Sequence, residues 1–213
     1  MMTLLVNATQ MKKCDDYTIE TIGIPAMVLM ERAALAVTSH ILETKKYDLS
    51  QVLVVVGAGN NGGDGYAIAR LLHLAGISVT LWEVGEATAF TKETAQQAKI
   101  CDHYQIPRLH RLDSFMGFTL LVDAYLGIGV TGQLRGPAAE IIERIGKSRL
   151  PVVAVDIPSG IDASTGESLG AYLQAETTIT FQFKKIAFTV SPGMEACGNL
   201  IVADVGISDE PLR

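Results

Sequence analysis

The sequence has few of the residues and segments that mark proteins outside the ordinary globular class. Its three cysteines are far apart, and the absence of a CxxC pair or Cys/His cluster gives no support for a disulfide framework or a zinc site. No apolar run reaches the roughly 20 residues needed to cross a bilayer. No basic segment precedes the N-terminal apolar stretch, so we expect no signal peptide. We therefore expect a soluble, cytoplasmic protein with reduced thiols and no membrane partner.

Basic residues are also in the minority. The chain has 17 Lys and Arg against 23 Asp and Glu, a formal net charge of −6. Surfaces that bind nucleic acid normally show the opposite balance, so we expect no nucleic-acid partner. With 213 residues, 48% of them hydrophobic, the chain is long and apolar enough to bury a core. We expect one domain spanning residues 1–213.

Short apolar runs alternate with helical stretches after residue 51. Strands are expected at 52–56, 77–82, 119–123, 151–155, 177–181 and 200–205, with helices at 66–75, 91–102 and 137–147 between them. Two N-terminal helices are expected at 8–22 and 25–43. Strands that alternate with helices predict an α/β fold of three layers, a Rossmann-like, doubly wound and mostly parallel sheet with N-terminal helices. The helix at 25–43 has a broader apolar surface than one buried stripe needs, which favours a homodimer.

Three polar, glycine-rich loops follow expected strands. They are GAGNNGGDG at 57–65, DAYLGIGVTGQ at 123–133 and DIPSGIDASTG at 156–166. The carboxyl ends of parallel strands meet at one edge of the sheet, where ligands bind in open α/β folds. Glycine lets a ligand approach the backbone, and the helix after the first loop directs N–H groups at a phosphate or pyrophosphate. The sequence therefore predicts a nucleotide pocket at this edge.

Oxygen-bearing side chains accompany these glycines. Asp123 and Asp156 each follow an apolar strand directly, Ser159 lies in the third loop and Asn61 in the first. Each aspartate alone could be a helix cap or a loop staple. Together these side chains offer the hard oxygen ligands that group I and group II cations prefer. We expect a cation beneath the nucleotide pocket.

A dehydrogenase is one alternative for the first loop. Gly57, Gly59 and Gly62 satisfy GxGxxG, and Glu83 ends the next expected strand, where a carboxylate would bind a ribose. The loop also carries Asp64, a carboxylate that a plain dinucleotide turn does not need. No tyrosine/lysine or histidine relay that would support hydride transfer is evident.

The three loops resemble those of the YjeF N-terminal domain family over residues 57–65, 123–137 and 155–167. The resemblance covers essentially the whole chain. It implies an NAD(P)H-hydrate epimerase activity, which interconverts the R and S forms of NADHX and NADPHX. It also implies that the dehydratase domain found in many relatives is absent, so that a separate protein performs dehydration. The alternative is a non-catalytic nucleotide-binding or dimerisation module of the same fold. The joint presence of Asn61, Asp123, Asp156 and Ser159 favours the enzyme.

The same resemblance assigns residues to the site. It implies potassium (K+) at Asn61, Asp123 and Ser159. It implies substrate contacts at Asn60, Asn61, Gly62, Gly63, Asp64, Gly127, Ile128, Gly129, Val130, Thr131, Gly132, Gln133 and Asp156. We assign proton transfer to Asp156 because it directly follows an apolar strand, with Lys185 as its partner. The reacting carbon is a carbinolamine, so either loss and return of the hydroxyl group or ring opening and reclosure would invert it.

Overall fold

The computed structural model of the protein describes residues 4–213, so residues 1–3, where the N-terminal apolar stretch begins, lie outside it. A seven-stranded sheet with the order β4-β3-β2-β5-β6-β7-β9 forms its centre, and each neighbouring pair is parallel. The strands are β2 (Val52–Val56), β3 (Val79–Glu83), β4 (Arg108–Leu109), β5 (Leu120–Ala124), β6 (Val152–Val155), β7 (Thr177–Phe181) and β9 (Asn199–Ala203). The chain runs outward from β2 to β4 and returns at β5, which makes the β2–β5 boundary the topological switch point.

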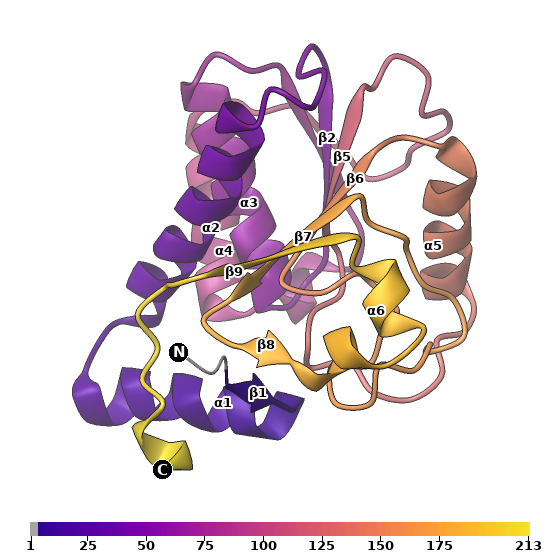
Figure 1. The fold of residues 1–213 in the computed structure, drawn as a ribbon. Coiled ribbons are helices and arrows are strands. Elements are labelled where there is room, and N and C mark those ends of the chain that lie inside the picture. Colours follow the sequence, from indigo (N-terminus) through magenta and orange to yellow (C-terminus); the bar gives the residue numbers. More distant parts are fainter. Residues whose placement is uncertain (1–3) are drawn as a thin grey trace.

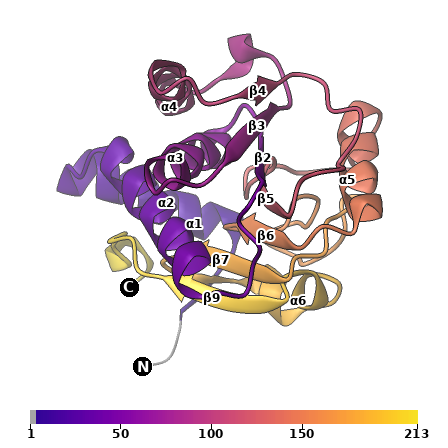
Figure 2. The ribbon, with the colours of Figure 1, turned by 90° about the horizontal axis from the view of Figure 1, so that it is seen from above.

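Helices cover both faces of this sheet. One layer consists of α2 (Ala26–Glu43), α3 (Asn60–Leu74) and α4 (Lys92–His103), and the other of α5 (Pro137–Ser148) and the short α6 (Gly193–Ala196) (Figures 1 and 2). Within the second layer, α6 lies beside β9 and α5 beside β5 and β6 (Figure 2). The predicted three-layer, doubly wound fold is confirmed. Among residues 4–213, the helices are all too short or too polar to pass through a membrane.

The alternating side chains of β2 explain its unbroken apolar sequence. All five residues of the strand are buried. Val54 and Val56 pack into the cluster that includes the inner face of α3, whereas Leu53 and Val55 pack with Ile142 of α5 on the opposite face. A strand covered on both faces has no solvent-facing positions, so the usual alternation with polar residues disappears.

The N-terminal segment lies across the carboxyl edge of the sheet. The helix expected at 8–22 is α1 (Ala8–Asp16) followed by a π-helical turn, η1 (Tyr17–Ile22), which ends at Gly23 with φ of 87°. Figure 1 shows α1 beneath the sheet, next to the two-stranded ribbon of β1 (Leu5–Val6) and β8 (Lys184–Lys185). The sequence does not predict this ribbon, because each of its strands has only two residues. The C-terminal turn η4 (Glu210–Leu212) also packs on α1.

Helix α3 begins at Asn60, not at residue 66 as the glycine content suggested. A β-carbon at Gly65 would lie 2.5 Å from Ala124 Cβ and 2.7 Å from Val56 Cγ1, so the first two turns of α3 lie directly on the sheet. Glycine disfavours a helix locally, but close packing against the strands overrides that preference here. The other predicted strand and helix boundaries agree to within one or two residues. The two-residue strand β4 and the four-residue helix α6 were not predicted, and two short helical turns, η2 (Ala87–Ala89) and η3 (Ile186–Thr189), complete the elements of residues 4–213.

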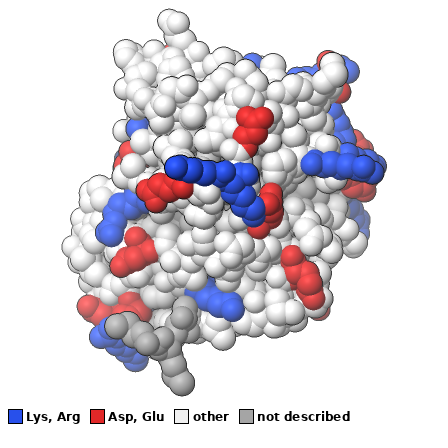
Figure 3. Space-filling model, turned by 45° about the horizontal axis from the view of Figure 1, so that its top comes forward, with Lys and Arg blue, Asp and Glu red and all other residues white. Residues whose placement is uncertain are grey.

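The surface charge is mixed on the face drawn in Figure 3. Acidic and basic side chains are interspersed there, and no continuous basic area covers it. This face therefore lacks the basic patch expected of a nucleic-acid-binding surface.

We predict opposite stability effects for two glycine-to-alanine substitutions in helices. Gly65→Ala forces a methyl group into the α3–sheet contact and should destabilise the protein by about 1–3 kcal/mol. Gly146→Ala in α5, where a β-carbon meets no atom within 4 Å, should stabilise it by about 0.5–1 kcal/mol through helix propensity. Urea unfolding of both variants measures the difference. Equal effects would contradict the close packing of α3 on the sheet.

Candidate active site

A cavity of about 910 Å³ opens at the carboxyl edge of the sheet, at the topological switch point. The turn from β2 into α3, the loop after β5 and the inner faces of α1 and α2 line most of it, and the turn after β6 contributes Asp156. Its volume is that of a site for a nucleotide-sized ligand. The three loops identified in the sequence therefore meet at one site.

The N-terminus of α3 forms one wall of the cavity. Its N-cap is Gly59, which has no side chain to cap the first N–H groups and would place a β-carbon in open space. Gly57 lies against the carbonyl of Tyr125, and Gly62 against the carbonyl of Gly57, too close for any side chain at either position. This close-packed turn presents the uncapped helix terminus to the cavity, an arrangement suited to a phosphate or pyrophosphate.

A buried carboxylate joins the loops after β5 and β6. Asp123 is fully buried; its Oδ1 accepts a hydrogen bond from Ser159 Oγ at 2.6 Å, and its Oδ2 accepts one from Ser159 N at 2.8 Å. The hydroxyl of Ser159 in turn accepts a hydrogen bond from Leu126 N at 2.9 Å. Burial raises the pKa of Asp123 to about 6, although the hydrogen bonds from Ser159 act in the opposite direction.

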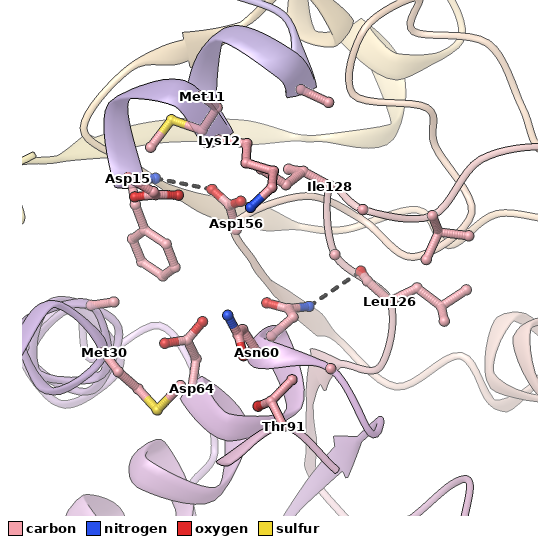
Figure 4. Close-up of a pocket in the computed structure, with 18 of the residues that line it drawn as sticks. Met11, Lys12, Asp15, Met30, Asn60, Asp64, Thr91, Leu126, Ile128 and Asp156 are labelled. Atoms are coloured by element: carbon pink, nitrogen blue, oxygen red, sulfur yellow. Dashed lines mark hydrogen bonds between the residues drawn. The ribbon is translucent and has the colours of Figure 1, made fainter. Parts of the chain in front are cut away.

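Asn61 completes this group. Its Nδ2 donates to the carbonyl of Leu126 at 3.2 Å, drawn as a dashed line in Figure 4. Its Oδ1 is buried and has no hydrogen-bond partner within residues 4–213. A buried acceptor without a partner is unfavourable, and a bound cation would satisfy it. The carboxylate of Asp123, the hydroxyl of Ser159 and the amide oxygen of Asn61 are hard donors that fit an alkali cation.

Asp156 and Lys185 form an ion pair at the cavity. Asp156 Oδ1 accepts hydrogen bonds from Lys185 Nζ at 2.5 Å, Thr180 Oγ1 at 3.0 Å and Phe181 N at 3.1 Å. The Lys185 side chain is fully buried, whereas that of Asp156 is 12% exposed. These three donors converge on one carboxylate oxygen and fix the orientation of the Asp156 side chain. The structure thus brings together the two residues to which proton transfer was assigned.

The backbone at Asp156 is shaped to direct this side chain. Its φ is 66°, in the left-handed region, and Ile157 N donates to Val155 O at 2.8 Å to close a three-residue turn. Non-glycine residues in this region are uncommon, and aspartate is among those that tolerate it. The turn ends β6 abruptly and leaves the carboxylate at the cavity.

Two further carboxylates line the cavity. Asp64 from α3 and Asp15 from α1 point into the space that Asp156 faces (Figure 4). Burial, and then the charge of Asp156, raises the pKa of Asp15 to about 7 and that of Asp64 well above its usual range.

Helix α1 contributes to the site in a way that the sequence does not predict. Lys12 and Asp15 both line the cavity, and their i, i+3 spacing places them on one face of the helix. No motif marks them, because the position of α1 over the sheet edge is fixed by tertiary contacts. The only local signal is the capping box of Asn7 and Gln10 that starts the helix.

The structure divides the residues predicted to contact substrate into two sets. Those lining the cavity are Asn60, Asn61, Asp64, Gly127, Ile128, Gly129, Val130, Thr131 and Asp156. Those outside its lining are Gly62, Gly63, Gly132 and Gln133. Gly62 and Gly63 are needed for packing: a β-carbon at Gly63 would lie 2.6 Å from Met30 Cε. Gln133 lies against Gly170.

Glu83, the candidate ribose ligand of a dehydrogenase, is engaged elsewhere. Its Oε1 accepts hydrogen bonds from Tyr66 OH at 2.8 Å and from Arg108 at 2.7 Å, and its Oε2 lies 3.2 Å from His110 Nδ1. Its side chain lines a second, smaller cavity rather than the one described above. This arrangement gives no support to a dehydrogenase.

The fold and the cavity define a Rossmann-like protein with a nucleotide-sized site at its switch point. Residues 26–187 match the family described as YjeF-related protein N-terminus, and the chain belongs to that family. It is 47% identical to the NAD(P)H-hydrate epimerase of Limosilactobacillus reuteri over 94% of each chain. It is 39% identical to that of Oenococcus oeni, covering 97% of this chain and 99% of the relative. The crystal structure of yeast ynu0 shares the fold, with a TM-score of 0.78 and 23% identity over 87% of this chain and 83% of that one.

We predict that Lys185→Met strongly destabilises the protein. The substitution leaves the mostly buried Asp156 carboxylate without its cation, and breaking a buried pair costs about 3–5 kcal/mol. Lys184→Met, in the same short strand but outside the ion pair, is the matched control and should have little effect. The free energy of unfolding in urea compares the two. Equal losses would show that the pair contributes no more than an ordinary surface lysine.

Proposed function

We propose that this protein is an NAD(P)H-hydrate epimerase that interconverts the R and S forms of NADHX and NADPHX. Relatives that match nearly the full length of the chain at 39–47% identity carry this name. The structural observation that supports it most is the Asp156–Lys185 pair, because it faces the same cavity as the uncapped N-terminus of α3. A non-catalytic module would have no need for such a pair in its cavity.

The cavity accounts for both halves of the substrate. The N-terminus of α3 at Gly59 offers N–H groups to the pyrophosphate. Asp156, and with it Lys185, then face the hydrated nicotinamide ring. The reaction involves no redox change, since only the configuration at the hydroxyl-bearing carbon is inverted. Either route to inversion needs a proton donor and a proton acceptor near that carbon.

We further propose that potassium binds at Asn61, Asp123 and Ser159. The unpartnered Oδ1 of Asn61 beside the buried Asp123–Ser159 pair supports this site. When bound, the ion would offset the negative charge of the pyrophosphate and fix the two loops. The chain's own contribution is to hold the three oxygens at the carboxyl ends of neighbouring strands.

The test is to supply R-NADPHX to the purified protein in potassium buffer and to measure its conversion to the S form by chromatography. We expect interconversion, and we expect replacement of potassium by sodium to raise KM because the cation site is then poorly filled. Asn61→Leu should abolish the difference between the two salts. No conversion in potassium would refute the function, whereas conversion that is indifferent to the cation would refute the potassium site alone.

We also propose that the protein acts in the cytoplasm as a homodimer and that a separate dehydratase consumes the S form. The outer face of α2 supports the dimer. Val28, Leu35 and Leu42 recur there every seven residues and are 45%, 45% and 37% exposed. Side chains at this spacing form one stripe along a helix, and a second copy of the chain offers a matching stripe.

A charge in this stripe should separate the subunits. We expect wild type to show the mass of a dimer in light scattering and Leu35→Glu to show that of a monomer, since a buried unpaired carboxylate is costly at an interface. Met116→Glu, at a side chain that is 90% exposed away from α2, is the control. A wild-type monomer at high concentration would overturn the dimer.

A further inference from the structure

Helix α1 carries an ionisable group to the wall that bears the Asp156–Lys185 pair. Asp15 lies on that wall, beside Asp156, while Asn60 and Asp64 face them from the opposite side of the cavity (Figure 4). The carboxylate of Asp15 accepts no hydrogen bond from any residue in the part of the chain that the structure describes. Its neighbour Asp16 also lines the cavity, but its side chain is 47% exposed and pairs with Lys12 Nζ at 3.0 Å.

The contacts of α1 hold Asp15 in this place. The helix starts at the Asn7 capping box, and beyond its end Thr18 Oγ1 accepts a hydrogen bond from Ser208 N at 3.0 Å. Tyr17 OH donates to Glu210 at 2.7 Å. The C-terminal tail thus ties the end of α1 to the body of the protein, so that Asp15 is fixed over the cavity.

The charges around Asp15 differ sharply from those around Asp156. Asp15 faces Asp156 and Lys185, with Asp64 across the cavity, and Lys12 and Asp16 flank it on α1. Glu93 of α4 lines the same cavity. Within residues 4–213, Lys185 is the one lysine that is buried, and its ammonium group is hydrogen-bonded to Asp156. Asp15 lacks such a donor and, with its pKa raised to about 7, keeps its proton in a substantial fraction of molecules at neutral pH. Two carboxyl groups whose environments differ in this way form an acid and base pair.

We propose that Asp15 protonates the ring nitrogen of the carbinolamine while Asp156 takes the proton of its hydroxyl group, which opens the ring. This inference rests on the proposed function and selects between its two routes. Both side chains lie on one wall, where they can reach two heteroatoms that share one carbon. Loss of the hydroxyl group and return of water to the other face would instead use a donor and an acceptor on opposite walls, as Asp64 and Asp156 are, and the oxygen-label experiment below distinguishes the two routes.

The step balances without any co-reactant. The hydroxyl proton moves to the Asp156 carboxylate. The electron pair of the O–H bond forms the C=O bond of the aldehyde, and the C–N bond breaks. Its electron pair stays on the ring nitrogen, which takes the proton of Asp15. Rotation about the adjacent C–C bond exposes the other face of the aldehyde. The nitrogen then attacks that face, returns its proton to Asp15, and the oxygen takes the proton back from Asp156. Each turnover restores the starting protonation of both residues, in either direction.

The first test is the rate of Asp15→Asn against that of Glu20→Gln, a control at an exposed carboxylate of η1 that does not line the cavity. Asp15→Asn should slow epimerisation by about 10²- to 10⁴-fold, the usual contribution of a general acid, while Glu20→Gln should stay close to wild type. The donor must be protonated, so the wild-type rate should fall as pH rises through about 7. That fall should be absent in Asp15→Asn and present again in Asp15→Glu.

The second test uses the wild-type protein in water labelled with heavy oxygen. Ring opening keeps the original hydroxyl oxygen, so the first S product should contain no label, whereas loss and return of the hydroxyl group would introduce one labelled oxygen per turnover. A labelled product, or an Asp15→Asn variant with the wild-type rate, would overturn this inference while leaving the epimerase intact. A wild-type protein that converts no substrate would overturn the proposed function itself.

Discussion

The site depends on one buried carboxylate, that of Asp123. It lies at the end of β5, the strand that follows the topological switch, between β2 and β6 in the sheet. Its two oxygens accept hydrogen bonds from the backbone N–H and the hydroxyl of Ser159. The Ser159 hydroxyl accepts one from Leu126 N, and the Leu126 carbonyl accepts one from the Asn61 side chain. Three segments distant in sequence are joined in this way at one point. A carboxylate with no exposure is unfavourable unless its oxygens are satisfied, so the loops can adopt their arrangement only together.

Much of the fold and part of the site could be predicted from the sequence. The unbroken apolar run of β2 and the polar loops that follow parallel strands place Asn61, Asp123 and Ser159 at one sheet edge. The start of α3 could not be predicted, because Gly65 disfavours a helix unless its contact with the sheet is known. Asp15 could not be found either, since nothing local to α1 states that this helix covers the sheet edge.

The cavity also shows how one residue type takes different roles. A buried lysine, a threonine hydroxyl and a backbone N–H all donate hydrogen bonds to Asp156. Asp15 and Asp64 share the same space without such donors from residues 4–213, and burial and the charge of Asp156 raise the pKa of both, which favours their protonated forms. Asp123 belongs to the structural network instead. The role of each carboxylate therefore depends on the hydrogen-bond donors around it and not on its position along the chain.

The most direct measurement of the central claim is a crystal structure of the protein in thallium, whose anomalous scattering marks a monovalent cation. We expect one strong peak within ligand distance of Asn61 Oδ1, the Asp123 carboxylate and Ser159 Oγ together. A map without density there, or with these three oxygens facing separate parts of the molecule, would contradict it.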